Sequence, residues 1–152
     1  MEIRKATQKD ARKISKLAIN SIAKIKSDKY SKKQIKVWMN MNIVSDVKTW
    51  FKVREVFVAE DKGKIIGTVS LNKNKFSRFF VKHNLQGKGI GKKLLKFIEN
   101  RVKKKGYKKI WMTSVPSAYN FYKKLGYKPK GKVILYSNRV RFTETKMEKK
   151  LK

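Results

Sequence analysis

The segment Leu85–Leu94 (LQGKGIGKKL) places three glycines at alternate positions between a predicted strand and a predicted helix. The strand is the apolar run Phe76–Val81. A helix start presents unpaired backbone amides and the positive end of the helix dipole, and glycines let a ligand approach those amides closely. The segment is therefore typical of an anion-binding loop. The helix after it has its apolar residues on one face, namely Leu94, Leu95, Ile98 and Val102.

Two common nucleotide-binding motifs do not fit this loop. A P-loop needs Ser or Thr directly after Gly-Lys to hold magnesium, whereas Lys93 follows Gly91-Lys92 here. A dinucleotide fingerprint needs two spacers after its second glycine and an acidic residue about twenty positions later, and neither is present. A nicotinamide cofactor is thus disfavoured. Without any ligand, the same glycines would serve a tight turn and close packing of the helix on the strand.

Strand and helix patterns alternate along the rest of the chain. Their order, β-α-α-β-β-β-α-β-α-β-β, predicts an α/β (α+β) fold with a mixed, mostly antiparallel sheet of about seven strands and about four flanking helices. We expect one domain over residues 1–148 and a basic tail over 149–152. The predicted elements are strands at Glu2–Ala6, Val56–Val58, Lys64–Leu71, Phe76–Val81, Lys109–Thr113, Val133–Tyr136 and Val140–Met147, and helices at Ala11–Ile25, Ser31–Met41, Gly91–Lys105 and Pro116–Lys124.

The charge of the chain favours anionic ligands. It carries 42 Lys and Arg residues against 10 Asp and Glu, a formal net charge of +32, which attracts phosphates, nucleic acids and acidic surfaces. Because the lysines are spread along every segment, the charge is equally compatible with lysine-rich composition alone. A nucleic-acid-binding protein is therefore an alternative. In that case the bases of the nucleic acid would stack on aromatic side chains such as Trp38, Trp50, Trp111 and Tyr119.

The absence of cysteine excludes disulfides, a thiolate nucleophile and a cysteine zinc site. With His83 as the only histidine, we expect no metal. The N-terminal MEIRKATQKD has no apolar signal region, and no apolar run approaches the ~20 residues that span a bilayer. The sequence thus predicts a cytoplasmic protein with no membrane partner.

Two motifs carry a resemblance to a known family. Gln86-x-x-Gly89-x-Gly91 resembles the acyl-CoA pyrophosphate loop of the GNAT N-acetyltransferase superfamily, and Ala118–Tyr127 (AYNFYKKLGY) resembles that family's second signature. Both stand in the family's order and on the expected elements, and the similarity extends over nearly the whole chain. Residues 29–34 with Trp38 also resemble, more faintly, the acceptor-side helix of one bacterial and archaeal branch.

This resemblance implies acetyl-CoA as the co-substrate and an amine as the acceptor. It implies that the end of the strand Phe79–Lys82 splays from the strand Lys109–Ser114, leaving a slot for the pantetheine arm. The loop amides would bind the pyrophosphate, with charge added by lysines. The cofactor-binding residues implied are Phe80, Val81, Gln86, Gly87, Lys88, Gly89, Ile90, Gly91, Lys92, Asn120 and Tyr122.

Acyl transfer to an amine needs a deprotonated amine, a stabilised oxyanion and a proton for the departing thiolate. With no cysteine, an acyl-cysteine route is excluded, so we expect direct attack in a ternary complex. Tyr122 aligns with the family tyrosine beside the CoA sulfur, and a phenol with a pKa of about 10 can donate a proton at neutral pH. We expect Tyr122 to be the general acid.

The general base stays open. Many family members have a glutamate before the glycine loop, but Lys73–Arg78 contains no carboxylate. Glu60, His83, Glu144 or a bound water are the candidates. Val115 stands where the family often has Asn, which makes Asn120 a substitute for that contact.

The acceptor is a small molecule or a protein amine, and the positive surface disfavours polycations. Since the usual glutamate is missing, a domain that binds CoA without catalysis is another alternative. The terminal hairpin is compatible with a monomer or a homodimer.

Overall fold

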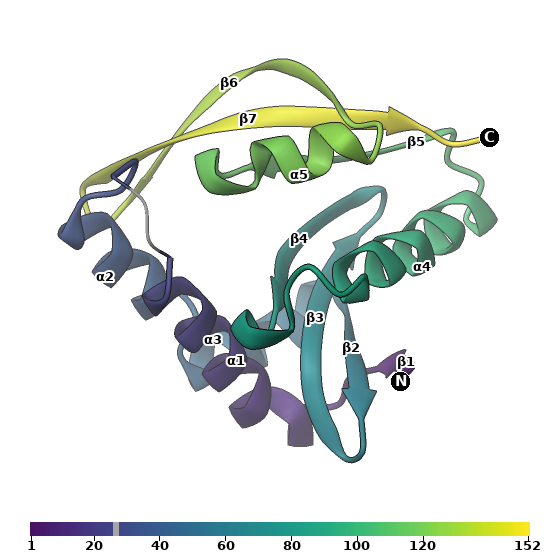
Figure 1. Ribbon diagram of the computed structural model, residues 1–152, viewed down its shortest axis with the longest axis horizontal. Helices are drawn as coiled ribbons and strands as arrows, with labels where there is room; N and C mark the ends of the chain where they lie inside the picture. The colour runs from purple at the N-terminus through teal and green to yellow at the C-terminus, as the bar shows by residue number, and fades with distance from the viewer. Residues whose placement is uncertain (26–27) are drawn as a thin grey trace.

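The computed structural model describes residues 1–25 and 28–152, which form a seven-stranded mixed sheet with helices packed on it (Figure 1). Neighbouring strands follow the order β1-β2-β3-β4-β5-β7-β6, and only β4 and β5 run parallel. The predicted fold class is therefore confirmed. The strands are β1 (Glu2–Lys5), β2 (Glu55–Asp61), β3 (Lys64–Asn72), β4 (Lys75–Val81), β5 (Lys109–Ser114), β6 (Lys128–Ser137) and β7 (Val140–Lys150).

The helices number five in the described residues, one more than predicted. The additional helix follows its neighbour after only three residues, and Ile43 at its N-cap provides no side-chain cap, so no start signal marks it in the sequence. No helix within residues 1–25 and 28–152 is long and apolar enough to cross a membrane. The helices are α1 (Ala11–Ala23), α2 (Lys32–Asn40), α3 (Val44–Val53), α4 (Ile90–Lys104) and α5 (Tyr119–Lys124), with 3-10 turns η1 (Gln8–Asp10), η2 (His83–Leu85) and η3 (Pro116–Ala118).

The side chains of strand β2 show what covers each face of the sheet, because successive side chains of a strand point to opposite faces. Val56 and Val58 are buried in the cluster that includes α1 and α3 residues. Phe57 and Ala59 are buried in the main cluster, which includes the apolar stripe of α4. Helices α1 and α3 therefore cover one face, and α4 covers the other (Figure 1).

The last hairpin is longer than the sequence pattern suggests. Strand β7 runs to Lys150, and its residues Lys149 and Lys150 pair with Ile110 and Lys109 of β5. Two of the four residues that we expected in a basic tail thus belong to the sheet. The apolar alternation stops before them, since backbone pairing rather than burial of side chains holds this end of the strand.

Strands β4 and β5 separate soon after they begin. Only Lys75 and Trp111 are paired in register, and the Trp111 amide also donates to the Asn74 carbonyl at 3.0 Å. Beyond this point β4 continues to Val81 without a strand partner on that side. In Figure 1 the hairpin of β6 and β7 lies above α5, and β4 lies below it. The splay therefore opens between the two parts of the sheet.

Candidate functional site

Two adjoining cavities occupy the region where β4 and β5 separate. The loop-side cavity, of about 440 Å³, is lined by the glycine loop at Gln86, Gly87 and Gly91. The hairpin-side cavity, of about 340 Å³, is lined by β6 and β7 residues such as Tyr136 and Phe142. The two cavities adjoin, because five residues line both of them: Trp38, Phe79, Phe80, Val115 and Tyr122.

The glycine loop presents free backbone amides at the start of α4. Gly87 and Gly89 have φ of +79° and +86°, a left-handed conformation that costs glycine little and other residues more. In the part of the chain that the structure describes, the amides of residues 87–92 have no hydrogen-bond partner. The first intrahelical donor is Lys93, which donates to the Gly89 carbonyl at 3.1 Å. The loop and helix start thus present the free amides that the predicted anion cradle requires.

Gly91 has a different role, because its φ is not left-handed. A Cβ built on it would lie 3.1 Å from the Phe79 ring and 3.3 Å from the Phe121 ring. Those two rings stack at a centroid distance of 6.0 Å and line the loop-side cavity. The missing side chain at Gly91 lets the aromatic wall of this cavity pack directly on the helix start.

Gln86 fixes the loop to the end of β4. Its side-chain amide donates to the Val81 carbonyl at 3.2 Å. The Ser21 hydroxyl of α1 donates to the Leu17 carbonyl at 2.8 Å and has the Val81 carbonyl as a second, weaker acceptor at 3.3 Å. The carbonyl of Val81 is therefore already engaged within the protein. The predicted residues Phe80, Val81, Gln86, Gly87 and Gly91 all line the loop-side cavity.

Other predicted site residues lie at the surface. Lys88, Lys92 and Asn120 are exposed, and they line neither cavity. The two lysines flank the free amides and add positive charge at the cradle. Nothing in the geometry brings Asn120 to the cavity, since it lies on the exposed side of α5.

Tyr122 lies between the two cavities on the buried side of α5. Its ring is 5.9 Å from the ring of Phe76 and 6.1 Å from that of Phe79, both on β4. Within residues 1–25 and 28–152 its hydroxyl has no hydrogen-bond partner. Burial raises the pKa of Tyr122 above the usual value of a phenol, and the negative charge of Glu144 raises it further. The phenol therefore stays protonated and can act as a proton donor.

Glu144 is the carboxylate that reaches this site. It lines the hairpin-side cavity from β7, and its Oε1 accepts a 2.6 Å hydrogen bond from the Thr113 hydroxyl of β5. Its charge acts on Tyr122, as the raised pKa of that phenol indicates. Of the three side chains considered as bases, Glu144 is the one in a cavity with Tyr122.

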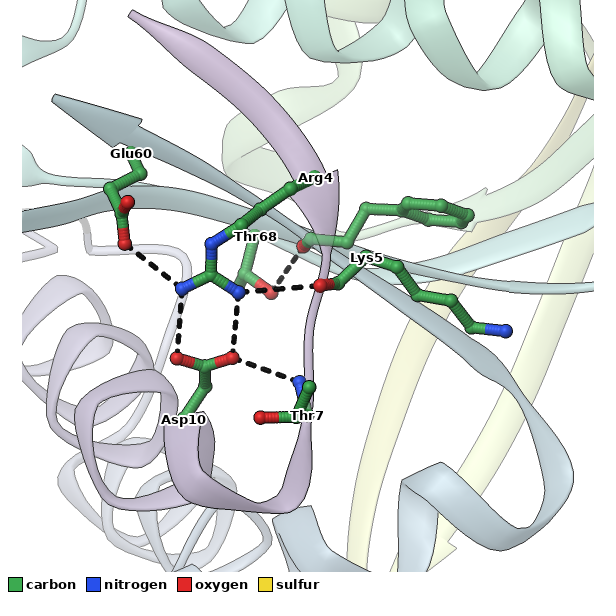
Figure 2. Close-up of polar contacts among 7 residues, drawn as sticks. Arg4, Lys5, Thr7, Asp10, Glu60 and Thr68 are labelled. Carbon is green, nitrogen blue, oxygen red and sulfur yellow. Dashed lines mark hydrogen bonds and ion pairs between the residues drawn. The ribbon is translucent and has the colours of Figure 1, made fainter.

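Glu60 lies elsewhere, in an ion cluster at the edge of the sheet (Figure 2). Arg4 Nη2 contacts a Glu60 oxygen at 2.9 Å, and Arg4 also binds Asp10 through both of its terminal nitrogens. Asp10 in turn accepts the Thr7 amide at 2.8 Å. This cluster joins β1, β2 and the start of α1. His83, the remaining candidate, is exposed on η2 and lines neither cavity.

The aromatic residues considered for base stacking do not form a surface platform. Trp50 is 4% exposed in the core, and Trp38 lines both cavities. The half-buried Trp111 lies under the Lys75 and Lys146 amines, at 4.9 and 4.6 Å from its ring centroid. These contacts account for the three tryptophans without a nucleic acid.

Several site residues were absent from the predicted set. Trp38, Phe79 and Phe121 line the loop-side cavity, but their apolar spacing predicted only core packing. The faint similarity of residues 29–34 with Trp38 to an acceptor-side helix was the one signal for that residue. Arg54 and Arg78 of the hairpin-side cavity carried no signal, because each stands in a short segment of mixed composition.

Comparison with protein families and solved structures agrees with this geometry. The family model described as an acetyltransferase (GNAT) domain matches residues 26–151. No curated protein matches the sequence.

The fold also matches solved structures. A GCN5-related N-acetyltransferase structure from Rhodopseudomonas palustris superposes with a TM-score of 0.93 at 21% identity, over 99% of this chain and 95% of that one. PaiA N-acetyltransferase from Thermoplasma acidophilum, in complex with coenzyme A, gives 0.77 at 24% identity over 98% of each chain. An aminoglycoside 6'-N-acetyltransferase complexed with coenzyme A gives 0.75 at 16% identity, over 100% of this chain and 98% of that one.

Proposed function

The chain belongs to the GNAT acetyltransferase family, and from this premise we propose that it transfers the acetyl group of acetyl-CoA to a primary amine by direct attack in a ternary complex. Acetyl-CoA occupies the loop-side cavity, and the amine occupies the hairpin-side cavity. The observation that carries this proposal is that the two cavities adjoin at Tyr122, so an acetyl thioester and an amine can meet beside one phenol.

The cofactor half of the proposal is supported by the free backbone groups around the loop-side cavity. The unpaired amides of residues 87–92 suit the diphosphate of CoA, and the helix dipole favours its negative charge. The edge of β4 that faces β5 has no strand partner beyond Lys75. Because the Lys82 amide donates to Ile66 of β3 and backbone groups alternate along a strand, Val81 rather than Phe80 presents its backbone groups at this open edge. Since the Val81 carbonyl already accepts a bond from Gln86, the Val81 amide is the better partner for pantetheine.

Two protein groups transfer the protons that this reaction requires. The amine nitrogen attacks the thioester carbonyl, a C–N bond forms, the C–S bond breaks, and CoA leaves as a thiolate. The amine loses one proton, and Glu144 accepts it directly or through a water. Tyr122, whose phenol is protonated at neutral pH, donates one proton to the departing sulfur. The products are an acetylated amine and free CoA.

Replacing Tyr122→Phe tests this function. We expect kcat in a thiol-release assay to fall by about 10²-fold or more, because general acid catalysis contributes about that much. Affinity for CoA, measured by calorimetry, should change little. Tyr119→Phe is the matched control, since Tyr119 is on the same helix and lines neither cavity. Failure of the wild-type protein to bind acetyl-CoA, or equal turnover in both variants, would contradict the assignment.

A further inference from the structure

We propose that the hairpin-side cavity accepts a small primary amine that also carries a carboxylate, with Arg54 and Arg78 binding that carboxylate, an assignment that rests on the proposed function. Both arginines line this cavity. The class of acceptor follows from the contacts that hold these two arginines and from their lack of an ion-pair partner among the described residues.

Arg78 lines the cavity from a part of β4 where the pairing with β3 is irregular. Ser77 pairs with Ser70 and Phe80 with Thr68, so two residues of β4 oppose one residue of β3. Arg78 has a φ of +53°, which is uncommon outside glycine. A bulge of this kind re-aims a side chain, and strain at such a position is often retained for function.

The guanidinium of Arg78 is held in place but not neutralised. Its Cζ lies 5.2 Å from the centroid of the Trp50 ring, a cation–π contact that fixes its plane. Arg54 reaches the same cavity from the end of α3, where it is the C-cap residue. Within the described residues, neither guanidinium has an ion pair or a side-chain hydrogen bond.

Two other arginines of this chain show the contrast. Arg4 is paired with Asp10 and Glu60, and Arg101 is paired with Glu55. A half-buried guanidinium normally finds a carboxylate, because removing a charge from water costs free energy unless a partner compensates it. Glu144 lines the same cavity, but among the described residues it forms no ion pair with Arg54 or Arg78, so the donors of both guanidiniums remain for a ligand.

The electrostatics of the cavity also favour an anion. Burial lowers the pKa of Arg78 and of Arg54, and the charge of Arg54 lowers that of Arg78 further, whereas Asp46 and Glu144 oppose this shift. Lys75 adds a third cationic group to the lining. A carboxylate between the two guanidiniums would relieve their repulsion and match the planar fork of each.

The other end of the acceptor is fixed by the reaction. Glu144 is the single carboxylate among the lining residues that the structure describes, so it is the place for the amine, next to Tyr122. The volume of about 340 Å³ suits a molecule of amino-acid size, at the small end of ligand cavities. A polycation such as an aminoglycoside would meet the two unpaired arginines and be repelled.

The test compares acceptors that share a chain length and an amine. We would measure kcat/KM for acetyl transfer to γ-aminobutyrate, its amide, butylamine, putrescine and aminopropylphosphonate. We expect the carboxylate to exceed its amide by about tenfold or more, since charge-assisted hydrogen bonds are about twice as strong as neutral ones. Transfer with equal kcat/KM for both, or a preference for putrescine or the phosphonate, would overturn the carboxylate assignment while leaving acetyl transfer intact.

Arginine variants locate the effect. Arg78→Gln and Arg54→Gln should each bring the carboxylate-to-amide ratio close to one through KM, and Arg78→Lys should restore part of it because charge returns without the fork. Arg12→Gln on the exposed side of α1 is the control and should keep the wild-type ratio. Unfolding curves identify any variant that fails to fold.

A binding measurement separates the two possible failures. Calorimetry on CoA-saturated wild-type protein with γ-acetamidobutyrate, the acetylated product, should give binding that Arg78→Gln loses and Arg12→Gln keeps. Equal binding of this product and its amide would overturn the inference. So would the absence of detectable binding of the product itself. Loss of the proposed function is recognised differently, by the failure of wild-type protein to bind acetyl-CoA.

Discussion

The Thr113 hydroxyl donates a 2.6 Å hydrogen bond to Glu144 Oε1, joining β5 to β7 at the hairpin-side cavity. This bond occupies one carboxylate oxygen, and among the described residues the other accepts no hydrogen bond, in a residue that lines the same cavity as Tyr122. The carboxylate is thus oriented by the sheet, at the place where an amine proton would have to leave.

Replacing Glu144→Gln should reduce kcat by about 10²- to 10⁴-fold, the usual contribution of a general base, while the affinity for CoA stays unchanged. Steady-state kinetics with thiol detection and calorimetry with CoA measure the two quantities. Thr113→Val keeps the carboxylate and removes its orienting bond, so its loss of kcat should be smaller. Wild-type kcat in Glu144→Gln would exclude this residue as the base.

Gly89→Ala should weaken CoA binding by about tenfold, since a residue forced out of the left-handed conformation moves amides that bind charged oxygens. Gly63→Ala in the turn between β2 and β3 is the matched control. Gly63 has a φ of +76°, and a Cβ at either glycine meets nothing within 4 Å. Both variants should therefore lose about 1–2 kcal/mol of unfolding free energy, but only Gly89→Ala should lose CoA affinity. Equal CoA affinity in both would contradict the cradle.

The ion pairs of Glu55 should make the protein less stable in acid. Hydrogen bonds from Arg101 of α4 and from Lys105 at its C-cap lower the pKa of Glu55 from 4.5 to about 2 in the folded protein. The stabilisation is therefore present above the unfolded pKa and is lost as the pH falls toward 2. Near neutral pH, Glu55→Gln should cost about 1 kcal/mol, because the partners are partly exposed, and this difference should shrink in acid. Chemical denaturation at several pH values measures it, with Glu2→Gln at the exposed edge as the control.

The burial of Tyr122 and Tyr127 should make the protein less stable in base. Burial raises the pKa of both phenols, and Glu99, which accepts a 2.8 Å hydrogen bond from Tyr127, raises the pKa of that residue further. The unfolded chain ionises its tyrosines near pH 10 while these two stay protonated in the folded state, so stability should fall as the pH rises above about 10. Tyr122→Phe should flatten this fall relative to wild type. If the unfolding free energy fell with pH as steeply in Tyr122→Phe as in wild type, Tyr122 would not contribute to this fall.

Local chemistry made much of the fold predictable. The stripe of Leu94, Leu95, Ile98 and Val102 has the period of a helix with one buried face, and all four are fully buried in α4. The turn at Lys62-Gly63 has two positive φ values, as expected for a tight hairpin. Helix α3 escaped prediction because no cap separates it from α2.

The site was less predictable than the fold, because it depends on contacts between distant segments. The glycine loop and Tyr122 were visible because their chemistry depends on backbone freedom and on a motif position. Arg78 lies at a bulge that depends on the pairing of β3 with β4, which no local pattern encodes. Trp38 lines both cavities only because α2 packs beside the splayed strands.

A crystal structure of the protein with bound CoA tests the central claim most directly. The proposed function predicts diphosphate oxygens within hydrogen-bonding distance of the amides of residues 87–92, and the sulfur beside the Tyr122 hydroxyl at the junction of the two cavities. A diphosphate held by lysines elsewhere on the surface, or a sulfur that lies away from Tyr122, would contradict it.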